Sequence, residues 1–273
     1  RLASTYNSGM GFLFRPKELP RPASLTFTLD QAGHTYDDGH VGLAPTDITI
    51  SELRVAVIGL NGAGKSTLLG LLDGSLKANA GTVTIAGGEE RLDPAVKKDA
   101  KRIDNLVGKV RREEIPNSFY QAANISEAVS EALKKHKVPE SERHARIGNL
   151  FAHFDLAQVS KAKASELDSE KRHLLAIAAA LSFEPSAIVA DEPSKGLDEI
   201  GAAHVAKALF SYNKQVIFAT HDTDLIVRPE YAIGRVLVVD DHRVVFDGVP
   251  REAVDFYTDL VRSKYEAAKG DRA

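Results

Sequence analysis

The stretch that decides the fold runs from residue 59 to residue 67 and is Gly59-Leu60-Asn61-Gly62-Ala63-Gly64-Lys65-Ser66-Thr67. A short apolar run rich in β-branched residues, 54–58, precedes it, and an apolar run that favours a helix follows at 67–72. A glycine-rich loop between a buried strand and a helix is typical of phosphate binding, because backbone N–H groups and the positive helix end face the anion. We therefore expect residues 61–67 to bind ATP, with Lys65 at the β- and γ-phosphates and the Ser66 hydroxyl on Mg²⁺.

Two later apolar runs end in side chains that suit the same chemistry. Residues 188–190 are followed by Asp191 and Glu192, and residues 216–219 are followed closely by His221. Asp191 can hold Mg²⁺, while Glu192 can polarise the water that attacks the γ-phosphate. His221 can hydrogen-bond the γ-phosphate. Taken alone, a solvated acidic turn and a structural histidine are the simpler interpretations, but the preceding phosphate loop favours the catalytic ones.

Composition and charge exclude several classes of protein. The chain has no cysteine, so disulfides and thiolate metal sites are excluded. The net charge of −3 does not favour nucleic acid as a partner. The longest apolar run, 174–183, is about half the length of a membrane span, and no secretory signal pattern is evident. We expect a cytoplasmic protein.

Strands and helices alternate along the chain, which predicts an α/β fold on a mainly parallel sheet. The charged, helix-rich middle, 94–181, predicts an inserted helical subdomain. Asp241-His242 marks the turn of a hairpin near the end. The expected strands are residues 25–29, 54–58, 82–85, 187–190, 216–219, 235–239 and 243–246. The expected helices are residues 67–72, 126–136, 141–154, 169–181, 202–212 and 250–268.

With these elements in this order, the chain resembles the ABC (ATP-binding cassette) ATPase family over about residues 25–256. The resemblance implies a P-loop NTPase with a RecA-like, mainly parallel sheet core, an antiparallel β part and an inserted helical subdomain. It makes residues 59–67 similar to the Walker A motif and 188–192 similar to Walker B, with Glu192 as the catalytic glutamate. His221 corresponds to the family's switch histidine.

Two further residues take their roles from the resemblance. Tyr36 stands where the family places an aromatic ring that stacks on adenine; a core or surface tyrosine is the alternative. Residues 194–198 resemble the D-loop, whose aspartate would be Asp198 at the interface with a second cassette.

The resemblance also implies a domain organisation. We expect an N-terminal extension at 1–20 and one ABC ATPase domain at 21–273. Within that domain, the helical subdomain covers about 112–182 and a C-terminal helical tail about 250–273.

The family's signature loop is altered. Its LSGGQ sequence should fall at Leu167-Asp168-Ser169-Glu170-Lys171, where only Leu167 agrees. In the family this loop closes over the γ-phosphate held by the opposite subunit, so Asp168 and Glu170 would bring carboxylates toward a polyanion. Lys171 could offset part of that repulsion. Asp168 also suits the simpler role of a helix cap, and both roles can hold together.

The Q-loop is the second departure. Aligning residues 107–110 with the family's strand puts Arg112 where a glutamine normally links Mg²⁺ to the membrane partner, or a neighbouring acid if the register slips. The alternative is that the charge run 111–114 is only a solvated loop.

The resulting functional prediction is an ATP-hydrolysing subunit that powers a membrane transporter, with ATP and Mg²⁺ as cofactors. We expect a second ABC ATPase subunit, in a homodimer or heterodimer, and separate transmembrane subunits, with this chain peripheral on the inner face of the membrane. The C-terminal half is most similar to the energy-coupling-factor group that imports vitamins and metal ions. The alternatives are a regulatory cassette with little turnover and a soluble non-transport ABC ATPase. A small-molecule kinase fits the acidic pair and the histidine poorly.

Overall fold

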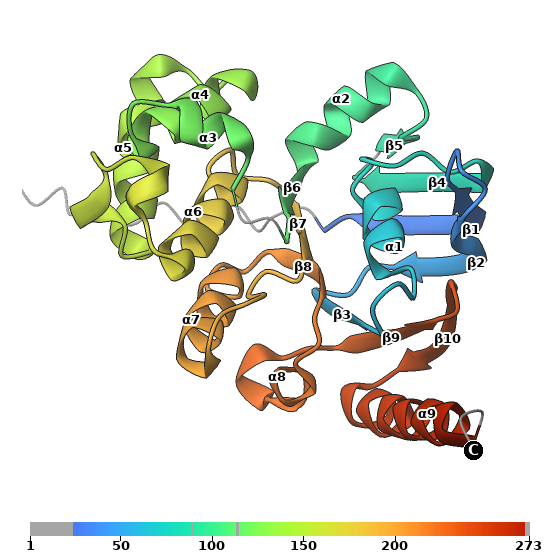
Figure 1. The fold of residues 1–273 in the computed structure, drawn as a ribbon. Coiled ribbons are helices and arrows are strands. Elements are labelled where there is room, and N and C mark those ends of the chain that lie inside the picture. The colour runs from blue at the N-terminus through green and yellow to red at the C-terminus, as the bar shows by residue number, and fades with distance from the viewer. Residues whose placement is uncertain (1–23, 89, 113–114, 271–273) are drawn as a thin grey trace, which may run out of the picture.

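Two β-sheets form the framework of the structure (Figure 1). The computed structural model describes residues 24–88, 90–112 and 115–270. The expected extension at 1–20 therefore lies outside the described residues. Helices lie between the sheets and around the larger one, and the helices α3 to α5 gather at the side away from the smaller sheet.

The larger sheet has six strands in the order β10-β9-β3-β8-β7-β6. All of these run parallel except β10, which returns antiparallel to β9 as the expected hairpin. The bounds are β3 Arg54–Ile58, β6 Val107–Val110, β7 Ala187–Asp191, β8 Gln215–Ala219, β9 Arg235–Asp240 and β10 Arg243–Gly248. Strands β7 and β8 are buried along their whole length, which explains their continuous apolar sequences.

The smaller sheet is antiparallel, with the strand order β2-β1-β4-β5. The bounds are β1 Thr26–Thr35, β2 Val41–Ile50, β4 Ala80–Gly87 and β5 Glu90–Leu92. Strand β1 extends beyond the expected residues 25–29, and β2 and β5 were not predicted at all. The Asp37–Gly39 turn was predicted, and it joins β1 to β2.

The expected helices occur close to their predicted positions, but two of them begin more than one residue earlier. The helix expected at 202–212 begins at Glu199, because Asp198 caps its first turn, and the helix expected at 67–72 begins at Lys65. Helices α2, α3 and α8 were not predicted. The bounds before β7 are α1 Lys65–Leu72, α2 Lys97–Leu106, α3 Asn117–Gln121, α4 Ile125–Lys135, α5 Glu140–His153 and α6 Ser169–Leu181. The bounds after β7 are α7 Glu199–Leu209, α8 Thr223–Val227 and α9 Pro250–Gly270.

Alternating side chains of the parallel sheet divide the core into two clusters. In β3, Val55 and Val57 pack with α1 and the antiparallel sheet, whereas Ala56 and Ile58 pack with the helices on the opposite face. Successive side chains of a strand point to opposite faces of the sheet. Because each face packs against its own core cluster, both faces are apolar. Helix α1 is buried between the two sheets, so the loop before it is held firmly in place.

A buried glutamine joins the two sheets. The side chain of Gln215, at the start of β8, is 2 % exposed. Its Oε1 accepts a hydrogen bond from Leu25 N at 3.0 Å, and its Nε2 donates to Leu25 O at 3.0 Å and to Glu52 O at 3.1 Å. Since Leu25 leads directly into β1, this amide satisfies buried backbone groups that neither sheet pairs.

We predict that Gln215→Leu lowers the free energy of unfolding by about 2–4 kcal/mol, because it leaves buried backbone groups of Leu25 and Glu52 unpaired. Urea unfolding followed by circular dichroism measures the change. The control is Gln158→Leu, an exposed position, where we expect a change within about 0.5 kcal/mol. Equal stabilities of the two variants would contradict the role of Gln215.

Candidate functional site

The phosphate loop lies between β3 and α1, with its glycines at positions where a larger residue would collide. Gly64 has φ 109°, and a Cβ there would lie 2.6 Å from Gly42 O. A Cβ on Gly59 would lie 2.1 Å from Val239 O. The backbone therefore approaches both β2 and β9 closely enough that only glycine fits. No side chain of the described residues caps the first turn of α1, which leaves its N–H groups for an anion.

Lys65 is buried at the base of this loop, 4 % exposed. Its Nζ donates to Gly59 O at 2.8 Å and to Leu60 O at 3.1 Å, and lies 3.8 Å from Glu192 Oε1. Burial lowers the pKa of Lys65, while the carboxylates of Glu192 and Asp191 act in the opposite direction. The ammonium group therefore lies where a phosphate oxygen can replace its carbonyl partners.

Asp191 is the last residue of β7 and Glu192 follows it, so both lie at the same edge of the sheet, and both are buried. Glu192 has φ 48°, a strained value for a residue with a side chain, and its N–H donates to Ala219 O at 3.1 Å. His221 Nε2 lies 2.8 Å from Glu192 Oε1 and 3.5 Å from Lys65 Nζ. The structure thus brings Lys65, Asp191, Glu192 and His221 together, as the sequence predicted.

The charge state of Glu192 suits a base. Burial alone would raise the pKa of this carboxyl, but electrostatic interactions with His221, Arg112, Lys65 and Lys195 together hold the pKa below its usual value. Glu192 is therefore ionised at neutral pH. Lys195, whose Nζ is 3.5 Å from Glu192 Oε2, was not predicted as a site residue. The sequence feature that could have indicated Lys195 is its position in the turn that directly follows Glu192.

Arg112 reaches directly into the site. Its Nη2 donates to Ser66 Oγ at 2.8 Å and lies 3.5 Å from Asp191 Oδ2 and 3.8 Å from Glu192 Oε1. The neighbouring Arg111 is 2.8 Å from Asp73 Oδ2, a fully buried carboxylate at the end of α1. The alternative of a solvated loop is therefore wrong for both arginines, while residues 113–114 lie outside the described residues.

Tyr36 lies beside the phosphate loop. Its hydroxyl is 3.0 Å from Thr67 Oγ1, and the residue is 38 % exposed. The His40 ring stacks near it, with 6.3 Å between the ring centroids. Tyr36 is therefore neither a core residue nor remote from the site, and its position is compatible with the predicted stacking on adenine.

The β9–β10 hairpin also contacts the phosphate loop, which the sequence did not predict. Asp241 and His242 adopt positive φ values of 46° and 61° at the turn. His242 N donates to Ala63 O at 3.0 Å, and Ala44 N donates to His242 O at 2.8 Å. The turn itself was predicted, but no local pattern indicates that it packs against a loop so distant in sequence.

The altered signature residues lie at the start of α6. Asp168 caps this helix by accepting a hydrogen bond from Lys171 N at 2.8 Å, which confirms the helix-cap interpretation. Lys171 Nζ lies 2.7 Å from Asp168 Oδ2, and Glu170 Oε1 lies 2.9 Å from His204 Nδ1 on α7. The hydrogen bonds from Lys171 lower the pKa of Asp168, so this carboxylate is charged at neutral pH. Ser169 follows the cap as the first residue of α6.

Asp198 caps α7 through Gly201 N at 2.8 Å. Together with Glu192 and His221 it lines a hollow of about 340 Å³. The predicted D-loop aspartate is thus next to the predicted catalytic pair, while its contact with a second cassette stays a prediction.

Comparison with known proteins identifies this arrangement. The family model described as ABC transporter matches residues 46–195, which include the phosphate loop and the acidic strand end. The chain belongs to the ABC transporter family. It is therefore an ABC ATPase, which confirms the expected fold class and enzyme class.

Individual relatives agree with that assignment. A putative ABC transporter ATP-binding protein of Deinococcus radiodurans is 34% identical over 229 residues, covering 84% of this chain and 96% of its own length. The energy-coupling factor transporter ATP-binding protein EcfA of Methanocaldococcus jannaschii is 31% identical, covering 80% of this chain and 76% of its own. Among solved structures, cbiO1 from Clostridium perfringens, part of the ABC transporter complex cbiONQ, matches this ABC ATPase with a TM-score of 0.71. That match has 27% identity and covers 88% of this chain and 94% of cbiO1.

Within the described part of the chain, no helix has both the length and the apolar character that a bilayer crossing requires.

We predict that Lys65→Ala weakens ATP binding at least about 100-fold, because the phosphates lose charge-assisted hydrogen bonds from a buried ammonium group. Isothermal titration calorimetry with Mg-ATP measures the affinity. The matched control is Lys97→Ala, an exposed residue at the start of α2, which should bind as the unaltered chain does. An unchanged affinity in Lys65→Ala would remove this lysine from the site.

Proposed function

We propose that this ABC ATPase binds Mg-ATP at the phosphate loop and hydrolyses it to power a membrane importer of the energy-coupling-factor type. The observation that carries the proposal is the cluster of Lys65, Asp191, Glu192 and His221 at the carboxyl edge of the parallel sheet. Lys65, Glu192 and His221 lie within 3.8 Å of one another, and Asp191 ends the strand directly before Glu192. They adjoin a loop whose N–H groups can bind an anion.

The donor atoms present fit a magnesium ion. Ser66 offers a hydroxyl oxygen, and Asp191 Oδ1 is buried with no hydrogen-bond partner among the described residues. Hard oxygen donors suit Mg²⁺, which completes its coordination with water and nucleotide phosphates. In the described residues no cluster of three or more His, Cys, Asp or Glu side chains offers a metal site, so nucleotide oxygens would be needed. When bound, Mg²⁺ neutralises charge on the β- and γ-phosphates.

Glu192 and His221 divide the remaining work in this proposal. The ionised Glu192 would accept a proton from the attacking water, since its pKa keeps it charged at neutral pH. His221, 2.8 Å from that carboxylate, would hold it in position and contact the γ-phosphate. Lys65 would exchange its bonds to Gly59 O and Leu60 O for bonds to phosphate oxygens.

A second cassette would complete the site. Asp168, Ser169, Glu170 and Lys171 would face the nucleotide of that partner, with Asp198 at the interface. The two signature carboxylates are already paired within the chain, Asp168 with Lys171 and Glu170 with His204. Such pairing reduces the repulsion of a polyanion, but the two carboxylate side chains cannot donate hydrogen bonds to it. A heterodimer in which the partner supplies an unaltered signature loop fits these contacts better than a homodimer.

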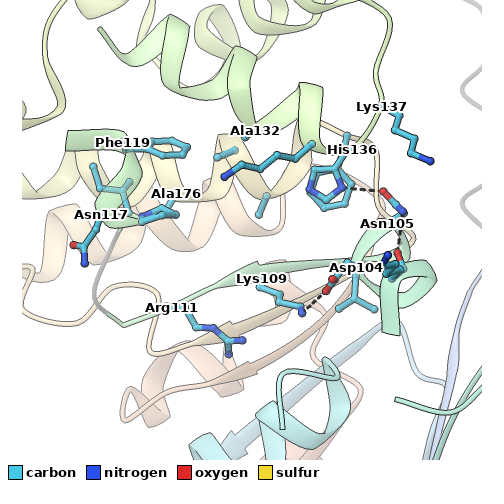
Figure 2. A pocket seen from close by; sticks show the side chains of 18 residues that line it. Asp104, Asn105, Lys109, Arg111, Asn117, Phe119, Ala132, His136, Lys137 and Ala176 are labelled. Atoms are coloured by element: carbon cyan, nitrogen blue, oxygen red, sulfur yellow. Dashed lines mark hydrogen bonds and ion pairs between the residues drawn. The ribbon is translucent and has the colours of Figure 1, made fainter. Parts of the chain in front are cut away.

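An open pocket between the parallel sheet and the helical region is the proposed docking place for the membrane subunits. Its volume is about 910 Å³, and Figure 2 shows Phe119, Ala132 and Ala176 on one side and Lys109 and Arg111 on the other. The apolar side of this pocket suits an amphipathic helical segment, while Lys109 and Arg111 on the other side are paired with Asp104 and Asp73. Arg111 lines this pocket, and the next residue, Arg112, contacts Ser66 of the phosphate loop. A segment bound in the pocket would therefore lie next to the nucleotide site.

The relatives support the location and the type of transport. The EcfA relative is an energy-coupling factor transporter protein, and cbiO1 is part of a transporter complex. The chain would then work in the cytoplasm, peripheral on the inner face of the cell membrane. A vitamin or a transition-metal ion is the proposed substrate class.

One observation favours a second candidate function, a regulatory cassette with little turnover. Arg112 contacts Ser66 and approaches Asp191, the two residues proposed to hold Mg²⁺, and the signature loop carries two carboxylates. Such a chain would bind ATP and stabilise a heterodimer while the partner's site hydrolyses.

We predict that Glu192→Gln binds Mg-ATP as tightly as the unaltered chain but hydrolyses it at least about 100-fold more slowly, because the base is lost. Phosphate release measures turnover, with the partner cassette present if the isolated chain is inactive. Glu252→Gln, an exposed change on α9, is the control and should retain full turnover. Binding without any hydrolysis by the unaltered chain, alone and with its partner, would favour the regulatory function.

We predict that Glu192→Gln alone stays monomeric in Mg-ATP, because each signature loop would bring Asp168 and Glu170 toward the partner's γ-phosphate. Adding Asp168→Ser and Glu170→Gly should produce an ATP-dependent dimer, since serine also caps a helix. Light scattering with and without Mg-ATP measures the mass. An ATP-dependent dimer of Glu192→Gln itself would make the homodimer the working arrangement.

A further inference from the structure

Arg112 occupies the space between the two residues that are proposed to hold Mg²⁺. Its Nη2 donates to Ser66 Oγ at 2.8 Å and lies 3.5 Å from Asp191 Oδ2. Glu192 Oε1 is 3.8 Å from the same nitrogen. A positive group thus contacts the hydroxyl and carboxylate that a metal ion would otherwise bridge.

The other cations of the site do not take this place. Lys65 is held by Gly59 O and Leu60 O on the loop side, and Lys195 approaches Glu192 through Oε2. The guanidinium group of Arg112 and a divalent cation would be only a few ångströms apart if both were present, and like charges at that distance repel strongly.

The Arg112 side chain is 36 % exposed, so it borders solvent, and the ion pair of the preceding Arg111 with the buried Asp73 holds the neighbouring backbone in place. To turn toward the phosphates, the Arg112 side chain would exchange its contacts with Asp191 and Glu192 for phosphate oxygens. A guanidinium group is positively charged and presents several N–H donors in a planar fork that matches phosphate oxygens. A glutamine amide is neutral and cannot form such charge-assisted hydrogen bonds.

We propose that Arg112 is a specificity-determining residue of this nucleotide site: it acts in place of Mg²⁺, so that the chain binds ATP almost equally well with and without the metal. Without metal, the guanidinium group stays between Ser66 and Asp191 and donates to phosphate oxygens. With metal, the guanidinium group is displaced, and the hydrogen bonds that it gives up offset the bonds that the ion forms. The inference rests on the proposed function, because it assumes that ATP binds at this loop.

The test is a calorimetric titration with ATP in Mg²⁺ and in EDTA, done on the unaltered chain and on Arg112→Gln. We expect the two affinities of the unaltered chain to agree within about threefold, whereas Arg112→Gln should bind at least about tenfold more weakly in EDTA than in Mg²⁺, the range of one charge-assisted hydrogen bond. Lys195→Gln is the matched control. It removes a positive charge near Glu192 without touching Ser66, so it should behave as the unaltered chain does.

A second measurement does not depend on metal-free binding. By linkage, the complex of the unaltered chain with ATP should hold Mn²⁺ at least about tenfold more weakly than the Arg112→Gln complex does. Electron paramagnetic resonance of Mn²⁺ reports this directly.

Equal metal dependence in the unaltered chain and Arg112→Gln would overturn the inference, as would a Lys195→Gln chain that behaves like Arg112→Gln. Both outcomes leave the proposed function intact, because ATP still binds. If the unaltered chain binds no ATP in either condition while its thermal unfolding is cooperative, the proposed function itself fails. The two failures are thus distinguishable.

Discussion

The parallel pairing of β3, β8 and β7 is the constraint on which the rest of the structure depends. Val57 pairs with Ala219, and Ala219 pairs with Asp191, so the three strands end at the same level of the sheet. Parallel strands bring their carboxyl ends to one edge, and loops that leave this edge converge. That register alone places the phosphate loop, the acidic pair and His221 within reach of one another. Burial of both faces of the sheet, against α1 on one side and α6 and α7 on the other, prevents the strands from slipping.

The parts of the fold and site that could be predicted are those with a local sequence pattern. The phosphate loop, the strand ends at Asp191 and His221 and the β9–β10 turn each have a recognisable pattern within a few residues. Helix α2 was missed because only Ile103 is buried along it, which leaves almost no apolar period. The contacts of Arg112 with Ser66 and of His242 with Ala63 depend on pairing between distant strands, which no local pattern encodes.

Charge is balanced locally at each departure from the family pattern. Arg111 neutralises the buried Asp73, Arg112 approaches Asp191 and Glu192, Lys171 pairs with Asp168, and His204 pairs with Glu170. If the charged residues at these altered positions only weakened nucleotide binding, no partners for their charges would be expected within the chain. The altered positions that carry a charge instead have ion-pair or hydrogen-bond partners within the same chain, so the changes in the Q-loop and the signature loop form a consistent arrangement.

The amide of Gln215 has a consequence for how a ligand is held. Tyr36 belongs to the antiparallel sheet and Lys65 to the loop after the parallel sheet, and the hydrogen bonds of Gln215 to Leu25 and Glu52 prevent these two sheets from shifting past each other. The span between the aromatic ring and the ammonium group is therefore fixed by the protein interior. A nucleotide that contacts both Tyr36 and Lys65 would have to match this fixed distance. A molecule with a base and too few phosphates would reach only one of these two residues.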